Sequence, residues 1–129
     1  MPRKQPDLFA SSQEQEILLE DPLARRSIYL ESLLCIAIRK RVLVKLQLKE
    51  YIAERLFEPT VVYLSKNHHL SVSGVQIADP EKPLIDPEFR TFQIGEIRSV
   101  LITEQAFVID PVVDPFDARY VNGIICSTY

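Results

Sequence analysis

The feature that most limits the possible folds of this sequence is a change in the spacing of its apolar residues near position 41. Between residues 30 and 38 the apolar residues recur at intervals of three and four, which places their side chains on one face of a helix. Between residues 42 and 48 every second residue is apolar, as in a strand with one buried face. The sequence therefore predicts a helix that leads directly into a sheet.

Both ends of this helix carry sequence signals. Asp21 can accept a hydrogen bond from a free backbone N–H of the first turn, and Pro22 suits the first helical position. Residues 39–41 are all cations, which suit the partially negative end of a helix. We therefore expect the helix over about residues 22–41, after a flexible N-terminus at residues 1–12.

More strand patterns follow the helix at short intervals. They cover residues 54–65, 70–78, 89–94 and 97–103, and residues 124–128 are a candidate for a last strand. Within the first of these patterns, Pro59 cannot donate to a sheet ladder, so it indicates an edge or a bulge. Turn signals that recur every ~8–12 residues are typical of a small all-β barrel or sandwich.

These patterns predict a mainly β fold class, in which an N-terminal helix packs on a small antiparallel β-barrel of five to six strands. The barrel strands occupy about residues 42–103, and residues 104–129 form an extended C-terminal tail. A chain of 129 residues fits one domain with one core. We place this single domain at residues 13–129.

The cellular location of the protein and the state of its cysteines are predicted from features that the sequence lacks. No apolar run approaches the ~18–20 residues that cross a bilayer, and the first residues lack the apolar centre of a secretory signal. We therefore expect a cytoplasmic protein. Cys35 and Cys126 lie far apart and form no CxxC pair, so we expect neither a disulfide framework nor a zinc site. We interpret each cysteine as a small buried apolar residue.

The sequence holds few residues of the kinds that catalysis and metal binding need. It has two histidines and three glycines, and it shows no Ser/His/Asp order, no carboxylate pair and no glycine-rich phosphate loop. His68 and His69 are adjacent, so in a strand they would point to opposite faces and could not easily chelate one metal ion. We expect no enzyme activity, no cofactor and no metal site, and we assign residues 66–69 to a turn.

The charges vary along the chain. Residues 1–76 hold 11 Lys/Arg and 9 Asp/Glu, whereas residues 77–129 hold 4 Lys/Arg and 9 Asp/Glu. A basic field over the whole protein is therefore absent, and any binding of nucleic acid has to be local.

Two predicted strands share an Arg-x-Phe pattern, with Arg55 before Phe57 and Arg90 before Phe92. Residues two apart in a strand face the same way, so each arginine shares a face with its phenylalanine. If the phenylalanine enters the core, the arginine lies at the mouth of the barrel, where its planar fork can bind an anion. The alternative is an ordinary surface ion pair with Glu54, Glu58 or Glu88.

The order of these elements resembles the WYL domain, which is found in many bacterial transcriptional regulators. The resemblance covers roughly residues 30–107 and is carried by the stretches "AIRKR", "VLVKLQL", "RLFEP" and "FRTFQIGEIRSVLITEQAF". Arg55 and Arg90 match arginines of the family individually, and Gln93 stands where the family has a further arginine. The resemblance implies an Sm-like barrel that senses a ligand or nucleic acid through a basic patch and has no enzymatic activity.

We therefore expect a regulatory or sensing module that acts in transcriptional regulation. Its ligand is anionic, either a nucleotide-like molecule or an oligonucleotide, and binds at a patch on the barrel rim. The expected patch consists of Arg55, Arg90, Phe92, Gln93 and Arg98. The alternative, which the long apolar stripe of the helix favours, is a protein interaction module that forms a homodimer or docks onto a separate DNA-binding partner.

Overall fold

A computed structural model describes residues 22–79, 82 and 86–128 of the chain. Helix α2 (Pro22–Lys40) confirms the helix that the sequence predicts, and Arg39 and Lys40 occupy its last turn as expected. The helix ends at Lys40, because the following Arg41 has a φ of 56°, which is incompatible with a further helical turn. The predicted cap Asp21 and the predicted flexible residues 1–12 lie outside the described residues.

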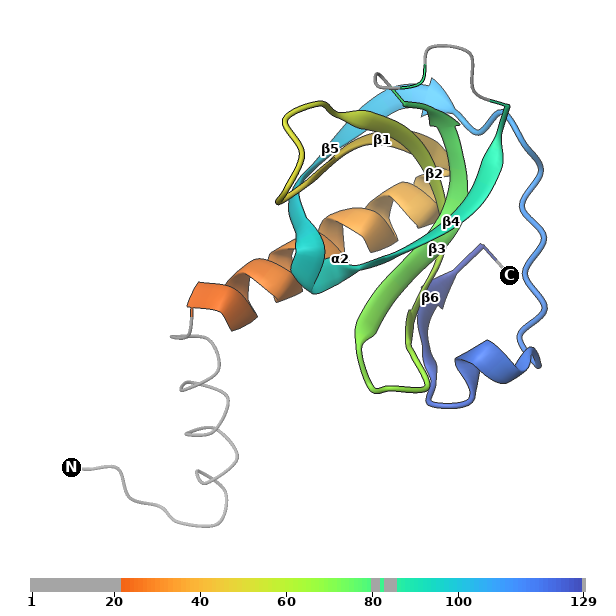
Figure 1. The fold of residues 1–129 in the computed structure, drawn as a ribbon. Coiled ribbons are helices and arrows are strands. Elements are labelled where there is room, and N and C mark those ends of the chain that lie inside the picture. Colours follow the sequence, from red (N-terminus) through yellow and green to blue (C-terminus); the bar gives the residue numbers. More distant parts are fainter. Residues whose placement is uncertain (1–21, 80–81, 83–85, 129) are drawn as a thin grey trace.

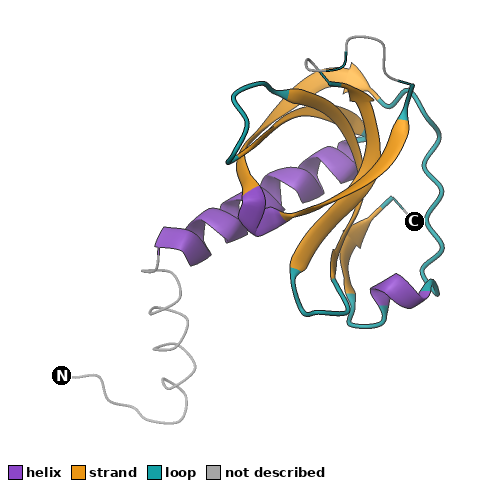
Figure 2. Cartoon of the chain, in the orientation of Figure 1, coloured by secondary structure: helices purple, strands orange, loops and turns teal. Residues whose placement is uncertain are grey.

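Six antiparallel strands follow the helix (Figures 1 and 2). They are β1 (Val42–Leu48), β2 (Arg55–Leu64), β3 (Leu70–Ala78), β4 (Glu88–Gln93), β5 (Ile97–Ala106) and β6 (Ile124–Ser127). Two short 3₁₀ helices, η1 (Ile94–Glu96) and η2 (Ala118–Tyr120), complete the described elements. The predicted strands and the predicted turn near His68 are confirmed, although β5 continues three residues further than predicted, to Ala106.

Strand β2 is the centre of the sheet because it has three neighbours. The strand order is β4-β3-β2-β1-β5, and β6 pairs with β2 in addition. β1 pairs with the first residues of β2, and β6 pairs with Val61, Val62 and Tyr63 near its other end. The register of β2 against β3 shifts between Pro59 and Val61, which confirms the bulge that Pro59 indicated.

The bulge requires a glycine on the neighbouring strand. Gly74 of β3 lies opposite Pro59, and a Cβ atom at Gly74 would overlap the backbone carbonyl oxygen of Glu58. The two backbones approach each other too closely at this point for any side chain.

Most buried apolar residues form one core between α2 and the sheet, which we call the main core. Figure 1 shows α2 lying across one side of the strongly curved sheet. The fully buried residues of the main core include Leu34 and Ile38 of the helix, Leu46 of β1, Phe57 of β2 and Ile97 of β5. The alternation that predicted these strands therefore does place their apolar residues toward the helix.

The segment after β5, residues 107–128, packs in part on the opposite side of β2 and ends in β6, which pairs with β2; we call this segment the strap. Tyr120 of the strap meets Val61 and Tyr63 of β2 in a second, smaller core. The rings of Tyr63 and Tyr120 lie edge to face, with their centroids 4.8 Å apart. The strap begins at the carboxylate of the fully buried Glu58, whose Oε1 accepts hydrogen bonds from the backbone N–H groups of residues 108 and 109.

The fold class is thus mainly β, with one helix and a six-stranded antiparallel sheet. Strands β4 and β5 are the two ends of the strand order and are joined through η1. Within residues 22–79, 82 and 86–128 no pairing connects these two strands, so the sheet is not closed.

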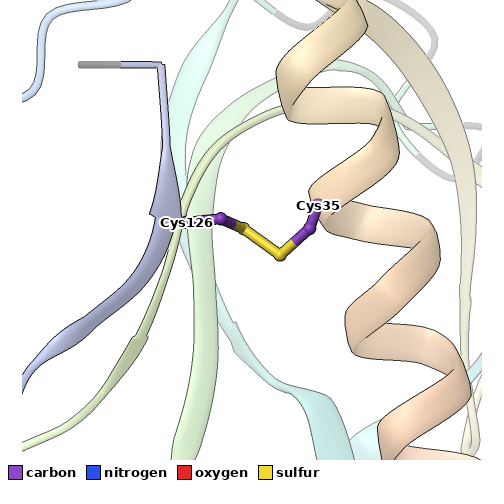
Figure 3. Close-up of a disulfide and its surroundings, with 2 residues drawn as sticks. All are labelled: Cys35 and Cys126. Carbon is purple, nitrogen blue, oxygen red and sulfur yellow. A yellow bond between two sulfur atoms is a disulfide. The ribbon is translucent and has the colours of Figure 1, made fainter.

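The expectation that the cysteines form no disulfide is wrong. Cys35 of α2 and Cys126 of β6 form a disulfide across 91 residues of sequence, and their Cα atoms lie 5.9 Å apart (Figure 3). Cys35 is buried in the main core, so its interpretation as a buried residue is confirmed. The pairing was not visible in the sequence because it depends on β6 folding back onto β2, next to the helix.

Candidate functional site

The two faces of the sheet carry different residues, and each predicted site residue can be assigned to one of them. Directly paired residues of antiparallel strands point to the same side. Val62, Val72 and Phe92 are paired in one row across β2, β3 and β4, and all three are buried in the main core. We call their side the inner face and the strap side the outer face.

Arg55 lies on the inner face at the start of β2, where its side chain is only 8% exposed. Its Nη1 atom donates to Oε1 of the fully buried Gln76 at 3.3 Å and lies 3.7 Å from Oδ2 of Asp79. Gln76 in turn donates to Asp79 at 3.4 Å. The guanidinium is therefore held in a buried polar group and does not stand open at the mouth of a barrel, where the sequence pattern predicted it.

The guanidinium of Arg55 is not fully satisfied by these contacts. Its Nε atom is buried and has no hydrogen-bond partner among the described residues. A buried donor without a partner costs about 1–3 kcal/mol and calls for an explanation, such as a bound ion or ligand. The ring of Tyr51 covers the guanidinium at 4.9 Å and is itself 42% exposed. A half-exposed aromatic ring thus separates an incompletely bonded cation from solvent.

Arg90 lies on the same face but at the edge of the sheet. Its side chain is 35% exposed, stacks over the Phe92 ring at 5.4 Å and pairs with Glu88 at 3.8 Å. Glu88 is one of the ion-pair partners that the alternative hypothesis considered for these arginines. Glu88 is directly opposite Gln76, which bonds to Arg55. The residue that bonds to Arg55 and the residue that pairs with Arg90 are therefore neighbours across β3 and β4.

The other predicted residues occupy three different positions. Phe92 is 5% exposed and packs edge to face on Phe57, so it is a core residue beneath Arg90. Gln93 is exposed, and the alternation of β4 directs it to the face opposite Phe92. Arg98 is exposed and donates to the carbonyl oxygen of Lys49 at 2.8 Å.

The contact of Arg98 is one of several that hold the loop at residues 49–54. Gln47 donates from Nε2 to the carbonyl oxygens of Tyr51, at 3.1 Å, and Ile52, at 2.8 Å. This loop carries the Tyr51 ring that covers Arg55. Arg98 therefore belongs to the support of the site and makes no described contact with either of the other two arginines.

We call Tyr51, Arg55, Gln76, Asp79, Glu88 and Arg90 the arginine cluster. It unites two predicted residues, Arg55 and Arg90, and leaves Gln93 on the opposite face. The sequence patterns did not identify Gln76 and Asp79 as its members. The sequence feature that could have identified them is their position. Gln76 lies near the end of β3 and Asp79 directly after it, and this end of β3 pairs with the Arg55 end of β2.

A pocket of about 350 Å³ lies beside Arg55. Lys45 of β1, Leu56 of β2 and Ala78 of β3 are successive neighbours across the strands at this point. The lining is completed by Glu54, Arg55 and Gln105. The lining holds two cations, Lys45 and Arg55, and one anion, Glu54, so the pocket next to the Arg55 guanidinium carries a net positive charge.

A second pocket, of about 280 Å³, lies between β4 and the strap. The guanidinium of Arg119 lies 5.3 Å from the Phe89 ring and 5.8 Å from the Tyr120 ring, and it pairs with Asp117 at 3.1 Å. The hydrogen bond from the backbone N–H of Arg119 lowers the pKa of Asp117, and burial raises the pKa of Tyr120. Asp117, Arg119 and Tyr120 all belong to the strap, and the contact of Arg119 with Phe89 joins the strap to β4 at this pocket.

The described residues, 22–79, 82 and 86–128, contain no group of three or more metal-ligating side chains and no helix long and apolar enough to cross a membrane. Comparisons with models of protein families, with curated proteins and with solved structures found no match.

Proposed function

We propose that this protein is a non-enzymatic regulatory or sensing module, that it binds an anionic ligand at the arginine cluster, and that it acts in transcriptional regulation in the cytoplasm. The ligand is nucleotide-like or a short oligonucleotide. The curved sheet behind the cluster is proposed to be an Sm-like barrel of the WYL type. The observation that carries the proposal is the buried guanidinium of Arg55, whose Nε atom has no partner among the described residues.

The contacts around Arg55 favour an anion that arrives from outside. Asp79 lies 3.7 Å from Nη1, which is long for a charge-assisted hydrogen bond and leaves Nε unused. A phosphate oxygen can accept from Nε, and a hydrogen bond to a charged group contributes about 1.5–3 kcal/mol. Arg90 supplies a second cation on the same face, with a side chain that is already partly exposed.

Tyr51 gives the proposed site a preference for ligands with a flat ring. The ring covers Arg55 and has one side open to solvent, and the loop that carries it must shift before an anion reaches Nε. Once shifted, the ring offers a stacking surface, and stacking of a base on an aromatic side chain contributes about 1–3 kcal/mol. A nucleotide combines both groups, a phosphate for Arg55 and a base for Tyr51.

The test is a thermal-shift and calorimetric titration of the purified protein with nucleoside monophosphates, cyclic dinucleotides and short single-stranded oligonucleotides. A ligand present at 100 times its dissociation constant stabilises the folded state by about 2.7 kcal/mol. Arg55→Lys keeps the buried charge but removes Nε as a donor, and Arg90→Ala removes the second cation. Each change should weaken binding at least about tenfold.

Two matched controls separate the site from general charge and ring effects. Arg39→Ala removes an exposed arginine of α2, and Tyr29→Leu removes an exposed ring, whereas Tyr51→Leu removes the ring of the site. The control variants should bind as the parent does. Unchanged binding by both Arg55→Lys and Arg90→Ala, or no binding of any of these anions by the parent, would refute the proposal.

A second candidate function is a protein interaction module, as a homodimer or with a separate DNA-binding partner. The observation that favours it is the exposure of large apolar side chains, with Val112 and Phe116 of the strap each 90% exposed and Tyr29 of α2 63% exposed. Light scattering at micromolar concentration tests the homodimer. A monomeric mass for the parent and for Phe116→Ser would count against it.

A further inference from the structure

We propose that the Cys35–Cys126 disulfide is a reversible fastener, and that its redox state decides whether the strap covers the outer face of β2. The proposal concerns a different part of the molecule from the arginine cluster and does not depend on ligand binding there. It takes from the proposed function only the cytoplasmic location, where disulfides are mostly transient or redox-sensing.

The disulfide joins the helix of the main core to the strap, and the strap depends on the bond for its position more than the main core does. Cys35 lies in the middle of α2, within the main core, and Cys126 lies on β6, the last strand of the strap (Figure 3). The main core is built from α2 and the strands that precede the strap. The strap contributes to a much smaller core around Tyr63 and Tyr120. Opening the bond should therefore loosen the strap and leave the main core folded.

The remaining attachments of the strap are local and mostly polar. Glu58 holds its beginning, Asn122 donates to the carbonyl oxygen of Ser65 at 2.9 Å, and Arg41 donates to the carbonyl oxygen of Thr128 at 3.0 Å. Strand β6 adds the short ladder with β2. Such contacts restore the closed strap readily when the disulfide forms again, because each partner on the sheet stays in place.

The strap covers a specific surface. Beneath it, the hydroxyl groups of Tyr63, Ser73 and Thr91 form a chain, with oxygen–oxygen distances of 3.1 and 2.7 Å. Tyr63 is 4% exposed and Ser73 is fully buried in the closed state. Thr91 is already exposed, so release of the strap would newly expose Tyr63 and Ser73 together with the apolar side chain of Val61.

The opening reaction is a thiol–disulfide exchange with a dithiol reductant. One thiolate of the reductant attacks Sγ of Cys126, because Cys126 is half-buried whereas Cys35 is 6% exposed. The S–S bond breaks, its electron pair passes to Sγ of Cys35, and a mixed disulfide forms at Cys126. The second thiolate of the reductant then displaces Cys126. The protein gains two electrons and two protons as two thiols, and the reductant leaves as its disulfide.

Hydrogen exchange measured by mass spectrometry tests the proposal on the full chain, oxidised and after treatment with dithiothreitol in native buffer. We expect amide exchange in residues 107–128 to become at least about tenfold faster on reduction. Exchange in the β2–β3 ladder should change less than about threefold. A Cys35→Ser/Cys126→Ser variant should match the reduced parent and should not respond to dithiothreitol, which controls for effects of the reductant itself.

Three results would overturn the proposal. The first is unchanged exchange in the strap after complete reduction, which would mean that the disulfide does not hold it. The second is equal loss of protection in the strap and in the β2–β3 ladder, which would make the bond a structural staple of the whole domain. The third is a bond that dithiothreitol cannot reduce, or that glutathione disulfide cannot restore, while the protein stays folded.

Discussion

Strands β2 and β4 carry the same Arg-x-Phe pattern, and their two phenylalanines meet while their two arginines differ. The rings of Phe57 and Phe92 lie edge to face, 5.2 Å apart, in the main core. Two residues before them, the side chain of Arg55 is 8% exposed and that of Arg90 is 35% exposed. The same local sequence therefore produces a buried cation in one strand and a partly solvated cation in the other.

The position of each strand in the sheet explains the difference. β2 lies at the centre and has β1, β3 and β6 beside it, whereas β4 is an end strand paired with β3. Arg55 is consequently surrounded by Gln76, Asp79 and the loop that carries Tyr51. Arg90 has solvent on its free side. A periodic pattern therefore predicts which face of the sheet a residue lies on, whereas the neighbouring strands determine how deeply that residue is buried.

The largest expected effect comes from removing the cation of β2. Arg55→Met removes the buried cation that bonds to Gln76 and lies beside Asp79, and breaking a buried ion pair in this way costs about 3–5 kcal/mol. Arg90→Met removes a partly exposed pair and should cost at most about 1 kcal/mol. Urea unfolding of the two variants beside the parent measures both values. Equal losses for the two arginines would break the comparison.

A glycine between the two strands provides the next test. Gly74 is paired with Pro59 of β2 and with Arg90 of β4, and a Cβ atom there would overlap the backbone of Glu58. Gly74→Ala should therefore lower the free energy of unfolding by about 3 kcal/mol. Gly95→Ala is the matched control, since nothing lies within 4 Å of its Cβ position. Its effect should stay within about 1 kcal/mol, as thermal unfolding of both variants will show.

The smallest of these effects concerns the contact that the two patterns share. A double-mutant cycle with Phe57→Leu and Phe92→Leu should give a coupling free energy of about 0.5–1.5 kcal/mol, because edge-to-face rings attract each other beyond their burial. Denaturant unfolding of the four proteins in the cycle supplies the value. Additive effects would mean that the two strands meet without a specific ring contact.

The local elements could be predicted from the sequence because local patterns determine them. The change of apolar spacing near Arg41 located α2 and β1, and Pro59 indicated the bulge of β2. The alternation in β4 also placed Phe92 in the core with Arg90 at its margin. Each of these inferences depends only on residues that lie within about one helical turn or one strand of each other.

The rest depends on which strands become neighbours. The burial of Arg55 requires Asp79, 24 positions later, to return beside it directly after β3, and the disulfide requires β6 to pair with β2. The periodicity of a strand does not predict which other strand it will pair with. The alternation of β4 alone predicts that Gln93 faces away from Arg90 and Phe92. Residues that stand close together in a sequence motif can therefore lie on opposite faces of a sheet.

The most direct test of the proposed function is a nuclear magnetic resonance titration that follows the arginine Nε–H signals while a nucleoside monophosphate is added. Arg119 serves as an internal reference, because its Nε already donates to Asp117 at 3.1 Å. We predict that the Nε–H signal of Arg55 shifts most, that signals of Tyr51 and Arg90 shift with it, and that Arg119 stays unchanged. An unchanged Arg55 signal when the protein is saturated with ligand would contradict the account.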